Sequence, residues 1–483
     1  MERLTNRHSL KPCASIARRL WTCALLSVTY LTCASGLAQE PAILVNPADI
    51  SASPLEPLPP PTALPEVVDA LTLERLEEMA LTGNPTICRA YAMVGAARGN
   101  WVQVGLKPNP SVGYEGQQLG SGGLAEQHGV LFSHEIPTGG KLRLNRAVAQ
   151  GEILIAEQEL AAQRQRVLTD VRIAYYQVLV AQRQVELADE LIRVSGEGSQ
   201  SVDALFRARE VGRVDVLQAQ LEGEQAQILL QDARNRYDAA WRSLAAILGN
   251  PAFPPQTLFG DPSGPPRGIE FEETLARLQA QSPEIGAAVA ELERARLAIN
   301  RARVQPIPNV TFQGLVNWQD NGIGGKPDGG VALSVPLPIF DKNQGAIMRA
   351  EREAAAARYA VSQVELDLQN RLAPVFEAYA NACNQVSRYR ETILPAAEES
   401  LTLTRQMYQA GEANYLGLLT AQRTFAQTNR NYLDSVLQLR IAETEIEGLL
   451  LSGSLQYRPG PDAMTGGATR TAIDSPRWEL SPR

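Results

Sequence analysis

The chain contains the same pattern twice, and this internal duplication limits the folds open to it more than any other feature. Pro85 and Pro283 lie 198 residues apart, and a helical pattern follows each of them. The motif PNPSVGY at 108–114 then matches PIPNVTF at 306–312 at the same spacing. An offset that persists over such a distance indicates two copies of one structural unit in tandem.

Two further pairs of motifs extend the duplication. A strand, a proline and a polar turn lead into a long helix at 130–141 (VLFSHEIPTGGK) and again 201 residues later at 331–342 (VALSVPLPIFDK). A helix-to-helix turn continues as VDVLQAQ at 214–220 and as LGLLTAQ at 416–422, now 202 residues apart. In the corners the proline ends the strand because it has no amide donor, and the polar turn starts the helix. Each unit is therefore predicted to contain helix, strand, loop, strand, long helix, turn and helix.

The segment 309–319 has the alternation of an amphipathic strand. One face is predicted to carry Val310, Phe312, Gly314, Val316 and Trp318, and the other Thr311, Gln313, Leu315, Asn317 and Gln319. Its length matches the roughly 9–11 residues that a tilted strand needs to cross a bilayer. An ordinary hairpin on a soluble sheet has the same pattern, so the strands alone leave both interpretations open.

The helical segments favour elongated packing. Residues 152–195 contain neither glycine nor proline, which predicts a rod of roughly 66 Å. Apolar residues recur every seven positions beside an alanine series: Val171, Val178, Val185 and Ile192 with Ala174, Ala181 and Ala188. This is a coiled-coil seam that lets helices approach closely, and only 6% of the chain is aromatic. A plain coiled-coil scaffold remains possible. Two hairpins give too few strands to close a barrel, so membrane-spanning strands would have to be pooled by several copies.

The N-terminal 38 residues have the basic, apolar and small-residue regions of a secretory signal, with cleavage expected after Ala38. Lipidation at Cys33 and a retained N-terminal membrane helix are the alternatives. The expected organisation of the chain follows the proline-rich pieces: signal peptide 1–38, N-terminal linker 39–69, first repeat 70–249, inter-repeat linker 250–268, second repeat 269–453 and polar tail 454–483.

Motifs for catalysis or metal binding are weak in this sequence. The segment PTGGKL lacks the first glycine of a P-loop and the Ser or Thr after Lys141. Only His128 and His134 follow the predicted signal. Cys88 and Cys383 are expected to pack as small apolar residues, and a disulfide between them is the alternative. The sequence predicts no enzyme, no cofactor and no metal site. The net charge of −8 makes nucleic acid an improbable partner.

Taken together, these motifs resemble the TolC-like outer-membrane efflux proteins over about residues 70–452. The resemblance implies a mainly α fold with a small β part. In such proteins three protomers pool twelve strands into one outer-membrane β-barrel, and long coiled-coil helices continue it as a periplasmic α-barrel. It also implies a homotrimer that conducts substrates passively out of the cell, with a periplasmic adaptor and an inner-membrane transporter of RND type as partners. The corner motifs EIPTGGK and PLPIFDKNQG look closest to the branch that serves heavy-metal exporters.

The resemblance also implies roles for particular residues. The lipid-facing strand residues are Val310, Phe312, Val316 and Trp318. The turns expected to meet the adaptor contain Gly212, Val216, Leu217, Gly411, Leu418 and Leu419. The periplasmic entrance is assigned to Asp215, Gly417 and Thr420, where the last two occupy positions that are often acidic in the family. A helix N-terminal cap is the alternative role of Asp215. The alternative for the whole chain is a secreted coiled-coil scaffold or adaptor subunit without channel activity.

Overall fold

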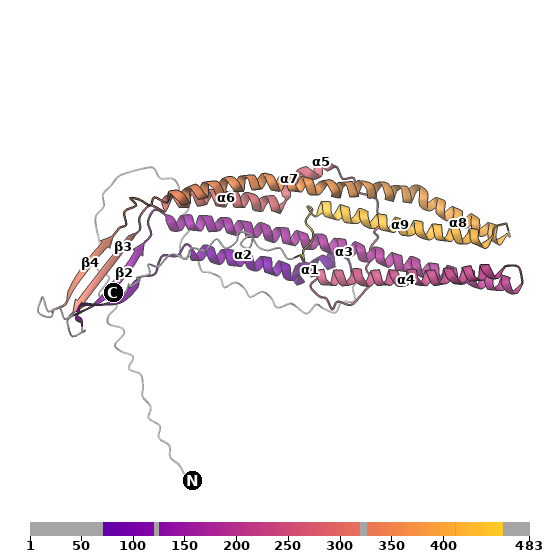
Figure 1. Ribbon diagram of the computed structural model, residues 1–483, viewed down its shortest axis with the longest axis horizontal. Coiled ribbons are helices and arrows are strands. Elements are labelled where there is room, and N and C mark those ends of the chain that lie inside the picture. The colour runs from indigo at the N-terminus through magenta and orange to yellow at the C-terminus, as the bar shows by residue number, and fades with distance from the viewer. Residues whose placement is uncertain (1–70, 120–124, 319–325, 411, 457–483) are drawn as a thin grey trace, which may run out of the picture. The chain divides into compact units, whose positions relative to one another are not determined.

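The computed structural model describes residues 71–119, 125–318, 326–410 and 412–456 (Figure 1). The predicted signal peptide, the N-terminal linker, all but the start of the C-terminal tail, and Gly411 lie outside the described residues.

The predicted elements occur in the predicted order in each repeat, but a short helix that was not predicted, α1 or α5, precedes them. The first repeat has α1 (Leu73–Gly83), α2 (Pro85–Gln103), β1 (Ser111–Leu119), β2 (Ala125–Ile136), α3 (Lys141–Arg207) and α4 (Arg213–Ile247). The second has α5 (Phe271–Gln281), α6 (Pro283–Val304), β3 (Val310–Trp318), β4 (Asp328–Ser334), α7 (Gln344–Arg388), the π-helical turn η3 (Tyr389–Ile393), α8 (Leu394–Gln409) and α9 (Tyr415–Glu447). The predicted fold class, mainly α with a small β part, is confirmed.

Equivalent helices begin in the same way in the two repeats. Asn84 precedes α2, and its Oδ1 accepts a hydrogen bond from the amide of Thr86 at 2.9 Å. Ser282 precedes α6, and its Oγ accepts from the amide of Glu284 at 3.3 Å. A proline follows each cap at the first helical position, where its missing amide costs nothing. The two capping residues are 198 positions apart, so the sequence repeat is also a repeat of the capping interaction.

The four strands form one antiparallel sheet in the order β1-β2-β3-β4. The central pairing of β2 with β3 joins the two repeats, with Phe132 opposite Gly314. The strand predicted in the motif at 331–342 is β4, which ends at Ser334. Among the described residues β4 pairs with β3 alone, so no second neighbour holds its last residues in a ladder.

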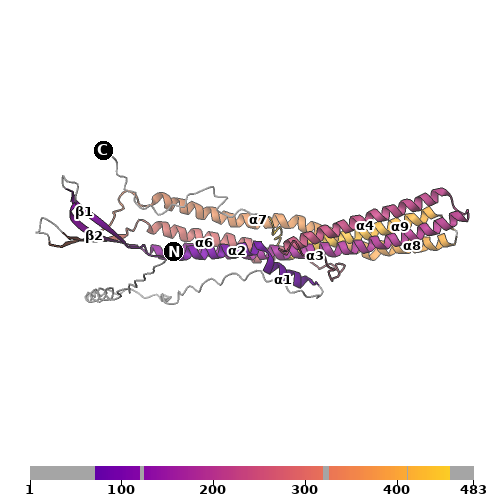
Figure 2. The ribbon, with the colours of Figure 1, turned by 90° about the horizontal axis from the view of Figure 1, so that it is seen from below.

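The seam predicted on α3 is buried over most of its length. Val171 and Val178 are fully covered, Ala174, Ala181 and Ala188 are buried, and Val185 and Ile192 are half-buried. Figures 1 and 2 both show α4 running alongside the distal part of α3, as the small alanines allow. None of the helices in the described residues combines the length and the apolar content that a membrane-spanning helix requires.

Each repeat has its own core, and the two cores correspond. Val171 of α3 and Leu372 of α7 are 201 positions apart, and both are fully buried. Leu244 of α4 and Ile446 of α9 are 202 positions apart and are also fully buried. The first core is centred on Trp241, which has no equivalent aromatic residue in the second. The duplication therefore extends from sequence to packing.

The proline-rich segment between the repeats is docked on the helices through its carbonyl groups. Tyr175 Oη donates to the carbonyl of Phe259 at 2.6 Å, and Trp241 Nε1 donates to that of Phe253 at 2.9 Å. Further along, Arg440 Nε donates to the carbonyl of Pro262 at 2.8 Å. Proline cannot supply amide donors, so side chains from both repeats satisfy this backbone instead.

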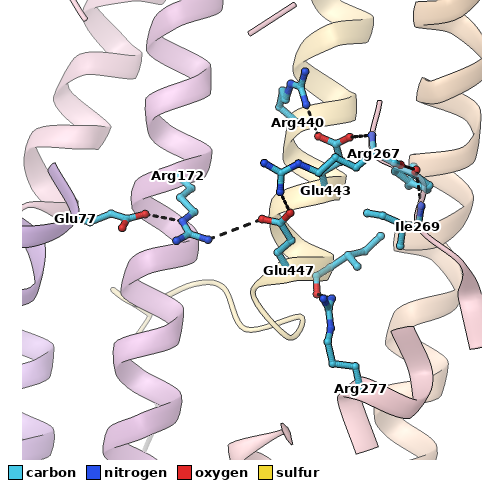
Figure 3. Close-up of polar contacts among 10 residues, drawn as sticks. Glu77, Arg172, Arg267, Ile269, Arg277, Arg440, Glu443 and Glu447 are labelled. Carbon is cyan, nitrogen blue, oxygen red and sulfur yellow. Dashed lines mark hydrogen bonds and ion pairs between the residues drawn. The ribbon is translucent and has the colours of Figure 1, made fainter. Parts of the chain in front are cut away.

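An ion-pair network joins the end of this segment to both repeats (Figure 3). Arg172 of α3 lies 2.6 Å from Glu77 and 3.9 Å from Glu447 of α9. Arg267 also pairs with Glu447, and its amide donates to Glu443 at 3.0 Å. Because these charges come from α1, α3, α9 and the inter-repeat segment, the network fixes the helices of one repeat against those of the other.

The second long helix differs from the first. α3 is continuous over 67 residues, whereas its counterpart is interrupted by η3, where the amide of Leu394 donates to the carbonyl of Tyr389 five residues earlier. A π turn of this kind contains one residue more than an α turn. Before η3, equivalent buried residues of the two helices are 201 positions apart, as Ala181 and Ala382 are. After it, the equivalent residues Ala208 and Ala410, whose amides end the two helices, are 202 positions apart. The additional residue of the second repeat is accommodated in η3.

Candidate functional site

The sheet separates apolar from polar side chains over all four strands. Residues directly opposite one another in an antiparallel pair point to the same face. Val112 is opposite Phe132, Val130 is opposite Val316, and Phe312 is opposite Leu333. The apolar face formed in this way also carries two histidines, His128 and His134. Its apolar residues are Val112, Tyr114, Val130, Phe132, Ile136, Val310, Phe312, Val316, Trp318, Val331 and Leu333. All four residues predicted to face lipid lie on it.

Several apolar side chains of this sheet are exposed, whereas two polar side chains of the opposite face are buried. Val316 on the apolar face is 57% exposed, and Val331 is 74% exposed. On the opposite face Asn317 is only 7% exposed and Gln127 only 5%. Exposed apolar patches normally mark a surface covered by lipid or by another protein. A face of this kind is what a bilayer requires on the outside of a strand, with a wet interior behind it.

Aromatic rings extend across the apolar face. Phe132 and Phe312 meet edge to face with centroids 6.3 Å apart. His128 stacks on Trp318 at 6.4 Å and forms a hydrogen bond with Tyr114. Within the described ranges no group of three or more His, Cys, Asp or Glu side chains is arranged to hold a metal ion.

The first strand-to-helix corner is closed by the second repeat. Lys141 at the start of α3 is buried, and its Nζ donates to Asn309 Oδ1 at 2.8 Å. Thr138 donates through its amide to the same Oδ1 at 3.3 Å and through its hydroxyl to the carbonyl of Pro308. Burial, followed by the charge of Arg301, lowers the pKa of Lys141. The corner motif therefore fixes the direction in which the long helix leaves the sheet.

The two helix-to-helix turns meet in one apolar cluster. Val202 of α3 and Val216 of α4 pack with Tyr415 and Leu419 of α9. Burial, followed by the neighbouring Tyr408, raises the pKa of Tyr415 to about 12. The two turns, far apart in sequence, therefore form a single structural unit at the distal ends of the helices (Figure 1).

The residues assigned to the entrance lie in the first two turns of α4 and α9. Asp215 is half-buried, and its Oδ2 accepts from the amide of Gly212 at 3.0 Å, so it stabilises the start of α4. At the equivalent place Gly417 donates its amide to Asn414 Oδ1 at 2.9 Å. Thr420 is exposed, and its hydroxyl donates to a backbone carbonyl of its own helix. The capping alternative for Asp215 is thus present in the structure.

Asp215 also faces the second repeat. Its charge contributes, after burial, to the raised pKa of Tyr408, and it is a smaller contributor to that of Tyr415. The Tyr408 hydroxyl is buried and has no hydrogen-bond partner among the described residues. A carboxylate near a partnerless phenol can form a new bond after a small movement, which links the two turns electrostatically as well as by packing.

The residues predicted to meet an adaptor divide into two groups. Val216, Leu418 and Leu419 are buried in the protomer, where they hold the two turns together. Leu217 and Gly212 are exposed. Sequence reasoning did not single out other exposed apolar side chains of this end, among them Val214, Leu221 and Leu416. On α4, the positions of Leu217 and Leu221 three and seven residues after Val214 were the signal that could have found this face.

A groove of about 410 Å³ lies among α3, α4, α8 and α9. Four arginines line it together with apolar side chains: Arg236, Arg405, Arg423 and Arg430. Arg423 also pairs with Glu222 across the helices at 2.5 Å. The carboxylates of Glu190, Glu222 and Asp232 also line the groove, so it offers charges of both signs beside apolar surface between the two helical hairpins.

Comparison with known proteins identifies the family. The sequence profile described as "Outer membrane efflux protein" matches residues 76–250 and again residues 274–450. The chain belongs to the outer membrane efflux protein family. The double match confirms the tandem duplication. This family consists of channels rather than enzymes.

Relatives cover most of this efflux channel. The cobalt-zinc-cadmium resistance protein CzcC of Cupriavidus metallidurans is 28% identical over 401 residues, which are 80% of this chain and 91% of CzcC. The cation efflux system protein CusC of Escherichia coli is 24% identical over 74% of this chain and 80% of CusC. The crystal structure of the CmeC outer membrane channel of Campylobacter jejuni has the same fold, with a TM-score of 0.65, 16% identity and coverage of 81% and 90%.

Family membership establishes the setting of the surfaces described above. The efflux channel is located in the outer membrane and extends into the periplasm. Channels of this family are trimeric parts of tripartite efflux pumps. The predicted fold and the predicted function of an outer-membrane efflux channel are confirmed.

Proposed function

We propose that this efflux channel is the passive exit duct of a pump that exports heavy-metal cations. The observation that carries the duct is the sheet whose apolar side chains gather on one largely exposed face, with mostly polar side chains on the other. The apolar face contacts outer-membrane lipid through Val310, Phe312, Val316 and Trp318, and the polar face lines a wet lumen. A secreted scaffold has no use for such a sheet, because its exposed apolar face would promote aggregation in water.

Adjacent residues of β3 test the two faces. Val316→Arg places a charge against lipid, which costs roughly 2–4 kcal/mol near the midplane of a barrel. Asn317→Arg adds the same side chain on the polar face and is expected to assemble far better. The measurement is the yield of folded oligomer in the outer membrane. Equal yields from the two variants would overturn the assignment of the faces.

The metal cargo rests on resemblance to CzcC and CusC, whose names refer to cobalt-zinc-cadmium resistance and cation efflux. A duct needs a wide lumen rather than a recognition site, so specificity is assigned to its partners. Deleting the gene is expected to sensitise cells to cobalt, zinc or cadmium, and the wild-type gene should restore resistance. Sensitivity only to organic compounds would reject the metal assignment while leaving the duct intact.

The partners proposed here are a periplasmic adaptor and an inner-membrane transporter of RND type. The adaptor is expected to contact the distal turns at Gly212, Leu217 and Gly411, with Val216, Leu418 and Leu419 supporting these contacts from inside. Leu217 is exposed, whereas Leu418 is buried. Leu217→Asp should therefore weaken adaptor pull-down without lowering the yield of folded channel. Full adaptor binding by this variant would move the contact elsewhere.

We assign the resting closure of the entrance to Asp215, with Gly417 and Thr420 at the constriction. Its position beside Tyr408 and Tyr415 supports this assignment. Asp215→Ala is expected to raise resting conductance in a bilayer recording. If Asp215 serves only as a cap, the variant loses about 1 kcal/mol of stability and its conductance stays unchanged.

The constriction is also expected to respond weakly to polyvalent cations. Gly417 and Thr420 have no acidic side chain, so block of the conductance by these cations should be weak. Strong block would place the constriction elsewhere.

A further inference from the structure

The polar face of the sheet carries charge of one sign only. Residues opposite one another in the strand pairings share a face, so this face contains Glu115, Glu135 and Asp328. Among the described strand residues it contains no lysine, arginine or histidine, because His128 and His134 lie on the apolar face. The wet side of the proposed barrel therefore presents acids without bases in its described strands.

Glu135 is the carboxylate of this face that lies closest to the helices, and it is linked to a base. Its Oε1 accepts a hydrogen bond from Asn309 Nδ2 at 2.6 Å. Oδ1 of the same amide accepts from the buried Lys141 at 2.8 Å. This charge is therefore largely balanced at the corner, which leaves the other two carboxylates as the acids of the face.

Glu115 and Asp328 are the two ends of one row across all four strands. Glu115 of β1 is opposite Gly129 of β2. Asn317 of β3 lies between Gly129 and Asp328 of β4. With about 4.8 Å between neighbouring strands, the two ends of the row are roughly 14 Å apart. At such a separation the carboxylates do not bind one ion together, and they act on ions through their electric field.

The inner part of the row contains polar groups without protein partners. Asn317 is 7% exposed, and its amide forms no hydrogen bond with the other described residues. A Cβ built on Gly129 would collide with Asn317 Oδ1, so the glycine makes room for this amide. Oδ1 of Asp328 is buried and has no hydrogen-bond partner within the described ranges. Buried polar atoms are normally satisfied, so these groups suit hydrated ions that pass along the row.

The distal end of the helices is less acidic at the positions assigned to the entrance. Gly417 and Thr420 have no charge, and Asp215 caps α4. A passage lined by charges of one sign raises the local concentration of ions of the opposite sign. We propose that the charge selectivity of the duct is set within the sheet, by Glu115 and Asp328, rather than at the distal entrance.

The inference rests on the proposed duct and assigns it a preference for cations over anions. Channels of this family are trimeric, so two carboxylates from each of three protomers place six in the passage. Lys326 opposes them, since it is exposed two residues before Asp328. It lies outside β4 and forms no ion pair with Asp328 in the described part of the chain. One base against two acids in each protomer leaves the row acidic.

The reversal potential in a planar bilayer measures this preference. With more potassium chloride on one side than on the other, the wild-type channel should give the sign of a cation-selective pore. Glu115→Gln combined with Asp328→Asn removes both charges and should shift the reversal potential towards zero. Glu115→Asp combined with Asp328→Glu is the conservative counterpart, which keeps both charges and should restore the cation preference.

Salt concentration provides a second measurement on the same channels. The screening length is about 10 Å at 0.1 M salt and about 3 Å at 1 M. Because the row acts through its field, the preference of the wild type should be clear at the lower concentration and weak at the higher one. A preference that is equally strong at both concentrations would contradict selection by these charges.

The outcomes separate the row from the duct. A channel that conducts with the same reversal potential in the wild type and in the neutral double variant would overturn the row and leave the duct intact. Equal shifts in the neutral and conservative variants would also reject the row, since shape rather than charge would then be responsible. A folded oligomer that stays silent would overturn the proposed duct instead.

A further variant keeps the test open if the neutral double variant fails to assemble. Asn317→Arg adds a positive charge between Gly129 and Asp328 and should shift the reversal potential of the conducting channel in the same direction. An unchanged reversal potential in this variant would reject the row.

Discussion

The two long helices of this channel have a common origin and differ in one region. α3 passes from the sheet to the distal turn without a break, whereas α7 and α8 are separated by η3. Up to η3 the buried positions of the two helices agree at an offset of 201, and beyond it the helix ends agree at 202. The difference teaches that an inserted residue can be kept in a packed helix when a single π turn absorbs it.

The residues beside the break show how each helix is stabilised there. Arg193 of α3 pairs with Glu190 and, at 2.6 Å, with Glu197, so charges on its own surface stabilise the helix. The equivalent position in α8 is Pro395, which has no amide to donate. Val202 of α3 is fully buried, but α8 has no buried side chain between Leu394 and Tyr408. The distal arm of the second repeat is therefore held less firmly.

The largest expected effect concerns the part of the two helices that is alike. Leu372→Ala should destabilise the channel by about 2–5 kcal/mol, because it leaves a cavity in the second core. Val171→Ala at the equivalent place should cost less, since it removes one carbon fewer. Urea unfolding followed by helical circular dichroism provides the measurement. A negligible cost at Leu372 would mean that the second core does not match the first.

A pair of deletions tests the break itself. Removing Arg390 from η3 should convert the π turn into an α turn and keep the phase of α8. Removing Asp189, its counterpart in α3, should rotate everything beyond it by about 100°. Val202 would then leave the distal cluster, at a cost of roughly 1.5–3 kcal/mol for this side chain alone.

The urea midpoints of the two deletion variants decide the matter, with Asp189→Ala as the control for the lost side chain. We expect the variant lacking Arg390 to unfold close to the wild type and the variant lacking Asp189 to unfold much earlier. Equal damage from both deletions would show that η3 does not hold the inserted residue.

Hydrogen exchange should reveal a smaller difference in the native state. Amides at 389–396 are expected to exchange roughly tenfold faster than those at 187–194, because the π turn and Pro395 weaken the local ladder. Mass spectrometry of the matching peptides would measure both rates in one sample. Equal protection would indicate that packing against α9 compensates for the break.

The smallest effect is expected at the surface of α3. Arg193→Ala removes two exposed ion pairs, and exposed pairs contribute little to stability. The urea midpoint should stay within experimental error of the wild type. A clear loss of stability would mean that these charges, rather than the absence of proline, keep α3 continuous.

Much of the fold could be predicted because its signals are local and repeated. The valine and alanine spacing on α3 predicts the seam, and the alternation around Val316 predicts the faces of the sheet. The π turn could not be predicted from proline alone, since Pro374 lies inside α7 without ending it. The change of offset from 201 to 202 between Lys342 and Leu418 was the available signal.

The distal turns were predicted in position but not in detail. Similarity between the two turns located Asp215 and Gly417 at equivalent helix starts. It could not show that Val216 and Leu419 are buried against one another, because that depends on how the two repeats pack. The docked inter-repeat segment was missed for the same reason, as its carbonyl groups find donors such as Arg440 far away in sequence.

The central claim is that the sheet with its exposed apolar face forms a membrane channel, and planar-bilayer recording of the purified protein tests it most directly. The account predicts stepwise conductance increases after insertion of the wild-type protein. Val316→Arg should give few or no insertions, and Asn317→Arg should insert with an altered conductance. A folded oligomer of wild-type protein that leaves the bilayer silent would contradict the account.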